Sequence, residues 1–117
     1  MKGTLRHAGI VVKDKKRLDL TLQFYLKLGF EYWTRSVEQW MGRTLNILKL
    51  KDRAGNVLEI IQGNWEPHVA ITLTDFEGVP EKAICQRETE QAVSFIMVDP
   101  SGNFVEMVHE KKGGGKG

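Results

Sequence analysis

The sequence has a single cysteine, Cys85, and only three prolines among its 117 residues. One thiol excludes an intrachain disulfide and is typical of proteins of the reducing cytoplasm, so we expect a cytoplasmic location. Long hydrophobic runs are also missing, because no apolar stretch approaches the ~20 residues of a membrane span. The N-terminus lacks the hydrophobic core of a signal peptide. With 41% hydrophobic and 27% charged residues, the composition is that of an ordinary globular protein.

An excess of charge of one sign is missing as well, since the formal net charge is only +2. The one basic cluster, from Lys13 to Arg17, is interpreted as the solvated start of a helix. We therefore expect neither a nucleic-acid partner nor a membrane partner.

What the sequence does contain is a repeat. Residues 52–61 return as residues 99–108, and both copies read Asp-x-x-Gly-Asn, an apolar pair, and Glu between hydrophobic residues. Asp-x-x-Gly-Asn favours a turn, and the apolar run after it is typical of a strand. Residues 7–12 and 68–73 also match, each with a His that opens a β-branched run. The order His, Glu, His, Glu indicates two homologous halves.

The first half is predicted to have the order β-α-β-β-β. Leu18, Leu22, Tyr25 and Leu28 recur at helical spacing between an Asp14 N-cap and a stop at Gly29. Strands are predicted at 5–12, 30–35, 44–50 and 57–62, with a loop or hairpin at 36–43 that exposes Trp40. Phe24 and Tyr25 are interpreted as core residues.

The second half is predicted to be shorter. Strands are expected at 69–73, 93–98 and 104–109, and the polar residues 85–91 form a ragged strand or a loop. Gly78 and Pro80 restrict the helix expected within 75–84 to a turn or two. The sequence thus predicts an α+β fold. Its modules span residues 1–64 and 65–110 within one overall domain, and a disordered tail covers 111–117.

Strand parity places the repeated His and Glu residues on comparable faces. In each strand one face is almost purely apolar, and the other carries one ionisable group. Singly, such a His is often an edge residue and such a Glu often faces solvent. A buried carboxylate, however, is costly unless it is paired, hydrogen-bonded or bound to a metal. Because the four positions match between the halves, we predict one metal site of His7, Glu59, His68 and Glu106, with His109 on the opposite face and excluded.

These motifs resemble the vicinal oxygen chelate superfamily, which contains glyoxalase I, bleomycin-resistance proteins and extradiol dioxygenases. The resemblance rests on His-x-Gly-Ile-Val-Val from His7, Phe24-Tyr25 followed by Leu28-Gly29-Phe30, and both Gly-Asn-x-x-Glu strands. It implies two βαβββ modules paired into a curved mixed sheet around a metal, here with a shortened second module. It also places the four predicted ligands on the metal positions of the superfamily and implies a homodimer.

Two imidazoles and two carboxylates suit Ni, Co, Zn, Mn or Fe(II). Four ligands on an octahedral ion leave two positions for a substrate that chelates through vicinal oxygens. The metal would act as a Lewis acid, and one Glu would move the proton as general base. The resemblance points to Glu106 as the base, with Glu59 as the alternative. We therefore predict a glyoxalase-like lyase or an epimerase-type isomerase.

Glutathione is a candidate co-substrate, because Asn64-Trp65 is similar to the glyoxalase I segment that contacts it. Val11, where glyoxalase I has an Arg, and the shortened second helix count against this choice. Epimerase-like proton transfer draws on the same class of ligands. Trp40, Trp65 and Phe95 are candidates for lining an aromatic substrate cavity, together with Trp33, and ordinary packing is the alternative.

Two other functions stay open at this point. A non-heme Fe(II) dioxygenase would need an open iron site, and the extra carboxylate and small size count against it. A bleomycin-resistance-type protein would sequester a ligand without catalysis, and such proteins usually lack the metal set. The metal content of the purified protein separates these readings.

Overall fold

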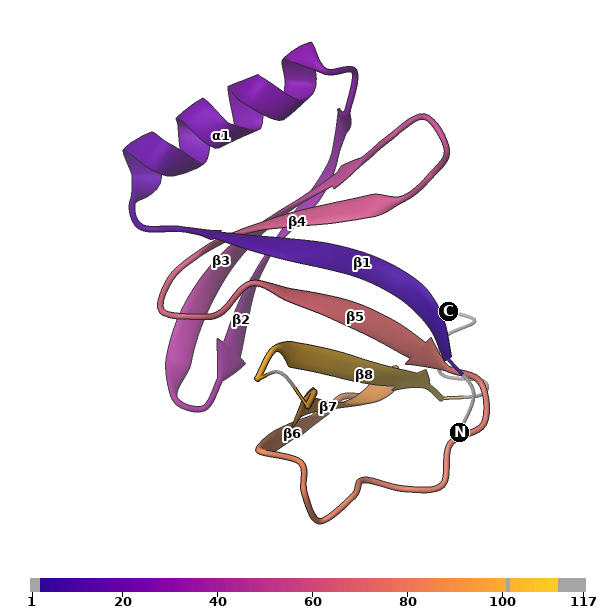
Figure 1. Ribbon diagram of the computed structural model, residues 1–117. Helices are drawn as coiled ribbons and strands as arrows, with labels where there is room; N and C mark the ends of the chain where they lie inside the picture. The colour runs from indigo at the N-terminus through magenta and orange to yellow at the C-terminus, as the bar shows by residue number, and fades with distance from the viewer. Residues whose placement is uncertain (1–2, 101, 112–117) are drawn as a thin grey trace. The chain divides into compact units, whose positions relative to one another are not determined.

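The computed structural model describes residues 3–100 and 102–111 (Figure 1). The elements in order are β1 (Gly3–Val12), α1 (Lys15–Lys27), β2 (Glu31–Trp40), β3 (Arg43–Lys51), β4 (Val57–Gln62), β5 (His68–Leu73), β6 (Cys85–Glu88), β7 (Ala92–Val98) and β8 (Phe104–Glu110). The predicted α+β class is confirmed. The chain divides into two compact units, residues 7–67 (the first unit) and residues 1–6 with 68–117 (the second unit). The tail expected at 111–117 lies, except for Lys111, outside the described residues.

The first unit is a complete β-α-β-β-β module. Its strands lie in the order β2-β3-β4-β1, with β1 and β4 parallel and the other neighbours antiparallel. The segment 36–43, expected as a loop or hairpin, is the tip of a long hairpin in which β2 and β3 meet at Met41 and Gly42. Both turn residues have positive φ, which suits a two-residue hairpin turn. The expectation that Trp40 is exposed is wrong: it is buried, because its ring packs against Trp65.

Helix α1 forms where the sequence predicts it. The Asp14 side chain accepts a hydrogen bond from the Arg17 backbone N–H at 2.8 Å, which caps the N-terminus. Gly29, with a φ of 96°, ends the helix in the left-handed conformation that favours glycine. Leu18 is the buried residue of the helix and joins a core cluster with Leu50 and Ile60. Helix α1 lies on one side of the strands of the first unit (Figure 1).

The aromatic pair on the helix has two different environments. Tyr25 packs edge-on against Phe30 at the margin of the core. Phe24 is exposed, so the interpretation of Phe24 as a core residue is wrong. The reason is the helical period, because a residue adjacent to a core-facing residue points about 100° away from it.

The second unit has the strand order β5-β8-β7-β6, with β5 and β8 parallel. The expectation of a short helix within 75–84 is wrong, because these residues form a loop. The loop contains a single turn, in which the Ala83 N–H donates to the Pro80 carbonyl at 3.1 Å. Phe76 of this loop stacks on His109 at 4.5 Å and packs against Phe95. The loop thus packs, through one aromatic ring, on the sheet face opposite to Glu106.

The repeated Asp-x-x-Gly-Asn segments form turns, as predicted. Asp52 Oδ1 accepts from the backbone N–H groups of Ala54 and Asn56, and Asp99 Oδ1 accepts from that of Asn103. The Asn56 side chain also donates a hydrogen bond to Asp52. This bond is the largest cause that holds the pKa of Asp52 below its usual value, and the backbone N–H donors of the turn lower the pKa further. Each turn leads directly into the strand that carries a repeated Glu.

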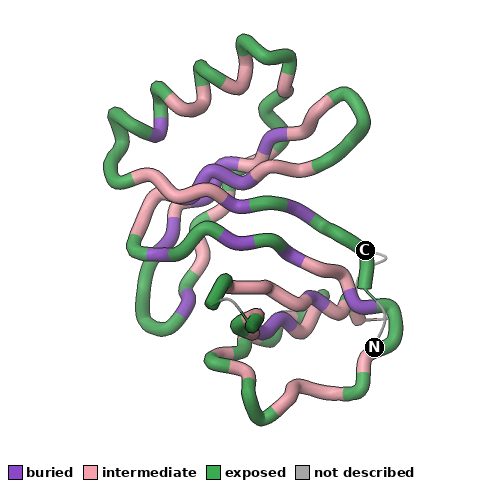
Figure 2. Tube along the Cα trace, in the orientation of Figure 1, coloured by how far each residue is buried: buried purple, intermediate pink, exposed green. Residues whose placement is uncertain are grey.

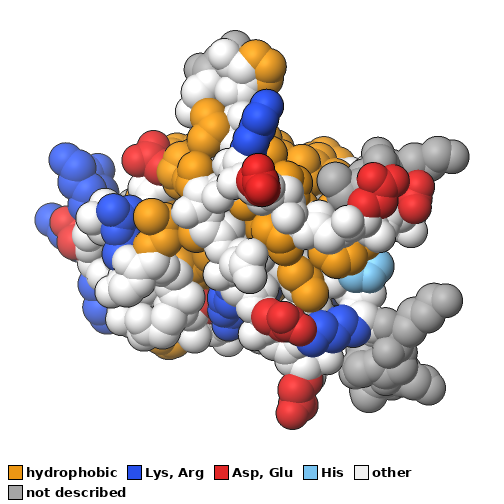
Figure 3. Space-filling view, turned by 90° about the horizontal axis from the view of Figure 1, so that it is seen from below, with side chains coloured by type: hydrophobic (Ala, Val, Ile, Leu, Met, Phe, Trp, Pro, Cys, Tyr) orange, Lys and Arg blue, Asp and Glu red, His pale blue; other side chains and the backbone are white. Residues whose placement is uncertain are grey.

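Buried positions concentrate on the strands of each unit (Figure 2). Hydrophobic side chains also reach the surface between charged groups, as the view from below shows (Figure 3). Val69, Ile84 and Val98 are exposed examples in the second unit, which has no helix among its described residues. The one helix of the described chain is too short and too polar to span a membrane.

Candidate functional site

The first candidate pair, His7 and Glu59, comes from the two parallel strands of the first unit. In this register Gly9 lies opposite Glu59, so His7 lies one diagonal step away on the same face. The gap is easily spanned, because Gly9 has no side chain to fill it. His7 Nε2 and Glu59 Oε1 are 3.2 Å apart, and both residues are buried.

The second unit repeats this geometry with His68 and Glu106. Strands β5 and β8 are parallel, and Ala70 lies opposite Glu106. Ala70 adds only a methyl group at the place of Gly9. His68 Nε2 lies 3.4 Å from Glu106 Oε1, with His68 buried and Glu106 partly buried. Within each unit, the His and the Glu that strand parity places on comparable faces lie close together.

The two carboxylates have different neighbours. Lys49 on β3 lies opposite Glu59, and its Nζ is 3.7 Å from Glu59 Oε2. In the second unit the corresponding neighbour is on β7, where the fully buried Ile96 lies opposite Glu106. On the next strand, β6, Cys85 lies opposite Ile96. Burial raises the pKa of the Cys85 thiol, and the negative charge of Glu106 raises it further.

Solved structures share this arrangement of strands. A variant of 4-hydroxymandelate synthase from Streptomyces coelicolor matches with a TM-score of 0.63 and 12% identity over 94% of this chain. This chain covers 49% of the synthase and so spans about half of its length. Methylmalonyl-CoA epimerase, in complex with methylmalonyl-CoA and NH4+, matches with a TM-score of 0.61 and 19% identity over 94% of this chain and 96% of its own. A variant of methylmalonyl-CoA epimerase from Streptomyces coelicolor, in complex with 2-nitronate-propionyl-CoA, matches with a TM-score of 0.60 and 20% identity. The match covers 90% of this chain and 95% of the epimerase.

The chain has the vicinal oxygen chelate fold. No protein-family model matches the sequence, and no curated protein matches it either. At these identities the likeness concerns the fold, and the function has to be argued from the side chains.

The sequence analysis did not identify Lys49 as a neighbour of the predicted ligand Glu59. Its signal is a lysine within the otherwise largely apolar run Leu45–Leu50. The run does not show which residue of another strand it faces, because that depends on the register of β3 against β4. Once the register is known, Lys49 is the cross-strand partner of a predicted ligand.

The substrate-binding candidates lie in separate units. In the first unit, the Trp40 and Trp65 rings are 5.9 Å apart, and the Asn64 carbonyl accepts a hydrogen bond from Arg43 at 3.2 Å. Phe95 belongs to the second unit and is fully buried. Trp33, half exposed, lies under the Lys51 ammonium group at 4.0 Å from the ring centre. The roles of Trp40, Asn64, Trp65 and Phe95 in substrate binding stay predictions.

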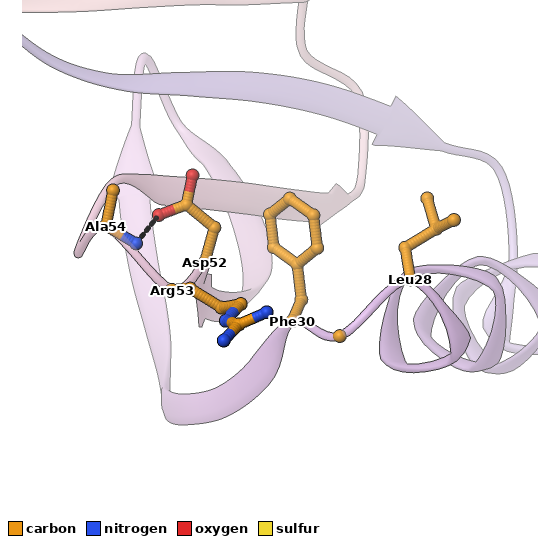
Figure 4. Close-up of a pocket in the computed structure, with 6 residues that line it drawn as sticks. Leu28, Phe30, Asp52, Arg53 and Ala54 are labelled. Atoms are coloured by element: carbon orange, nitrogen blue, oxygen red, sulfur yellow. Dashed lines mark hydrogen bonds between the residues drawn. The ribbon is translucent and has the colours of Figure 1, made fainter.

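A shallow pocket in the first unit is a poor candidate for the site. It is lined by Gly29, Glu31, Asp52 and Arg53 and has a volume of about 310 Å³. A second pocket shares part of this lining and is formed by Leu28, Gly29, Phe30, Asp52, Arg53 and Ala54. Figure 4 shows this second pocket, with the Asp52 carboxylate turned back to the Ala54 N–H of its own turn. Neither lining holds a histidine, so both pockets lack the donor set of the predicted metal site.

The chemistry of the two pairs fits a divalent cation. Each pair offers an imidazole nitrogen and a carboxylate oxygen near hydrogen-bond distance, at positions where burial makes an uncompensated carboxylate costly. Nitrogen and oxygen donors of this kind suit borderline first-row metals. The assignment of all four side chains to one ion stays a prediction.

Proposed function

We propose that this protein is a metal-dependent enzyme that moves a proton on a small substrate held through two neighbouring oxygens. The observation that carries the proposal is the duplicated pair of a buried His and a buried or partly buried Glu, found at matching strand positions in both units. A single pair of this kind has a structural explanation as a hydrogen-bonded couple. Two copies built on the same diagonal geometry favour a shared chemical purpose.

His7, Glu59, His68 and Glu106 would hold the ion. When bound, the metal supplies Lewis-acid stabilisation of the negative charge that develops on a substrate oxygen as the proton leaves. Ni, Co, Zn, Mn and Fe(II) all accept this donor set. The burial of the first pair limits competition from water for these ligands.

Glu106 is the proposed base. Its side chain is the more exposed of the two carboxylates, with 15% exposure against 6% for Glu59. A carboxylate that moves a proton must reach the substrate, so greater access favours Glu106 for this role. His7 and His68 would serve as fixed ligands.

The substrate class that the proposal favours is a carbonyl compound with an acidic proton on the adjacent carbon. Thioesters such as methylmalonyl-CoA are of this class, and the epimerase with the same fold was solved with that compound. The thiohemiacetal of methylglyoxal and glutathione is the candidate for a glyoxalase-like reaction. Both reactions need the same removal of a proton beside a carbon–oxygen bond. A homodimer remains part of the prediction.

Exchange of the substrate proton with D₂O, followed by NMR, tests the proposal. Protein loaded separately with Ni, Co, Zn and Mn would be offered methylmalonyl-CoA and the methylglyoxal–glutathione adduct, with metal-free protein as the control. We expect exchange that requires the metal. A folded protein that binds no divalent ion would contradict the proposal and favour a ligand-sequestering protein. Bound iron with consumption of O₂ and no exchange would favour a dioxygenase.

A further inference from the structure

Lys49 is a charged residue placed where the repeat has no charged counterpart. Its ammonium group lies 3.7 Å from Glu59 Oε2, while the other oxygen, Oε1, faces His7 Nε2 at 3.2 Å. The two oxygens of this buried carboxylate are therefore turned toward different partners. Lys49 itself is only about one-quarter exposed, with 26% of its side-chain surface accessible.

The second unit shows the alternative. Glu106 occupies the same position as Glu59 in its module, and the cross-strand position opposite it is filled by Ile96. Ile96 is a fully buried hydrocarbon and supplies no charge. The duplicated modules thus differ at the residue that faces the carboxylate, although they agree at the His and the Glu.

We infer that Lys49 is a positioning residue that holds Glu59 to a single ligating oxygen and so leaves the proton-moving role to Glu106. This inference rests on the proposed metal-dependent function. An ammonium group paired with Oε2 opposes use of that oxygen by the ion, because the cation and Lys49 compete for the same negative charge. On β7 the residue that lies opposite Glu106 is the apolar Ile96.

Removal of the Lys49 ammonium group should raise the affinity of the site for a divalent cation. Without the ammonium group, both oxygens of Glu59 become available to the ion, and the repulsion between Lys49 and the ion disappears. Both changes strengthen cation binding, whereas a merely structural lysine would leave the affinity unchanged or lower it through misfolding. Affinity and coordination number therefore report on this role without any measurement of turnover.

The experiment is a Co²⁺ titration of the full chain, followed by calorimetry and by the visible absorption of the bound ion. The variants are Lys49→Met, Lys49→Gln, Lys49→Arg and the matched control Lys51→Met. Lys51 lies on the same strand two residues away, and its ammonium group packs over Trp33. Circular dichroism verifies that each variant folds, and the two neutral variants at position 49 protect the test against failure of one of them.

We expect Lys49→Met and Lys49→Gln to bind Co²⁺ about tenfold more tightly, or more, with weaker visible absorption as the coordination number rises. Lys49→Arg, which keeps the charge, should stay close to the wild type, as should Lys51→Met. Equal or weaker binding by the neutral variants, or an unchanged spectrum, would overturn the role of Lys49. A wild-type protein that binds no Co²⁺ would instead overturn the proposed function itself.

Discussion

At the scale of single residues, the two His–Glu pairs depend on what lies opposite each Glu. On the parallel neighbouring strands, Gly9 of β1 lies opposite Glu59 and Ala70 of β5 lies opposite Glu106, and both are too small to fill the space beside the carboxylate. A larger side chain at either place would separate the His from its Glu. The strand period of two, read from the sequence, predicted that each His and each Glu lie on comparable faces. Which His contacts which Glu depends on the register of the parallel strands.

Replacement of Glu106 by Gln tests its role as base. The amide keeps the shape of the side chain and an oxygen donor but cannot take a proton, so we expect the exchange rate to fall by about 10²–10⁴-fold. Metal content and exchange rate should be measured on the same preparation, with Glu59→Gln as the matched variant. Full turnover by a metal-loaded Glu106→Gln protein would remove Glu106 from this role.

The reactivity of Cys85 is a second test at this scale. Because burial and the Glu106 charge raise its pKa, the folded protein holds less thiolate at a given pH than the unfolded chain does. Iodoacetamide labelling between pH 7 and 10, followed by mass spectrometry, should rise at a higher pH in native protein than in urea. Superimposed pH profiles for the two states would contradict the raised pKa.

At the scale of elements, local signals predicted what the structure shows, and non-local contacts did not show in the sequence. The Asp14 cap and the Gly29 stop define α1, since each acts within a few residues of itself. The burial of Trp40 was missed because its partner, Trp65, comes 25 residues later. For the loop in place of the second helix, Gly78 and Pro80 correctly indicated a break in the helix. The contacts of Phe76 were not predicted, because they involve residues of strands further along the chain.

Truncation of Leu18 tests the packing of α1 on its sheet. Leu18→Ala should lower the free energy of unfolding by about 2–5 kcal/mol, because the side chain is buried against Leu50 and Ile60. Leu20→Ala is the matched control, since Leu20 is exposed on the same helix and should change stability by less than about 1 kcal/mol. Urea unfolding followed by circular dichroism gives both values. Equal losses in the two variants would contradict this packing.

At the scale of the whole molecule, the repeat predicted the α+β fold and its likeness to the vicinal oxygen chelate fold. Each half carries its own His, its own Glu and its own turn, so the comparison of the halves substitutes for information from other sequences. The repeat could not predict Lys49, because the feature that matters there is the difference between the halves. A repeat indicates the residues that two modules share and does not indicate the positions at which the modules differ.

The central claim is that both His–Glu pairs serve one ion, and metal stoichiometry tests it most directly. Ions bound per chain should be counted by calorimetry and elemental analysis for the wild type, His7→Ala and His68→Ala. The account predicts about one divalent ion per chain in the wild type and a loss of at least about tenfold in affinity when either histidine is removed. No bound ion in the wild type, or two ions per chain with each variant losing only one of them, would contradict it.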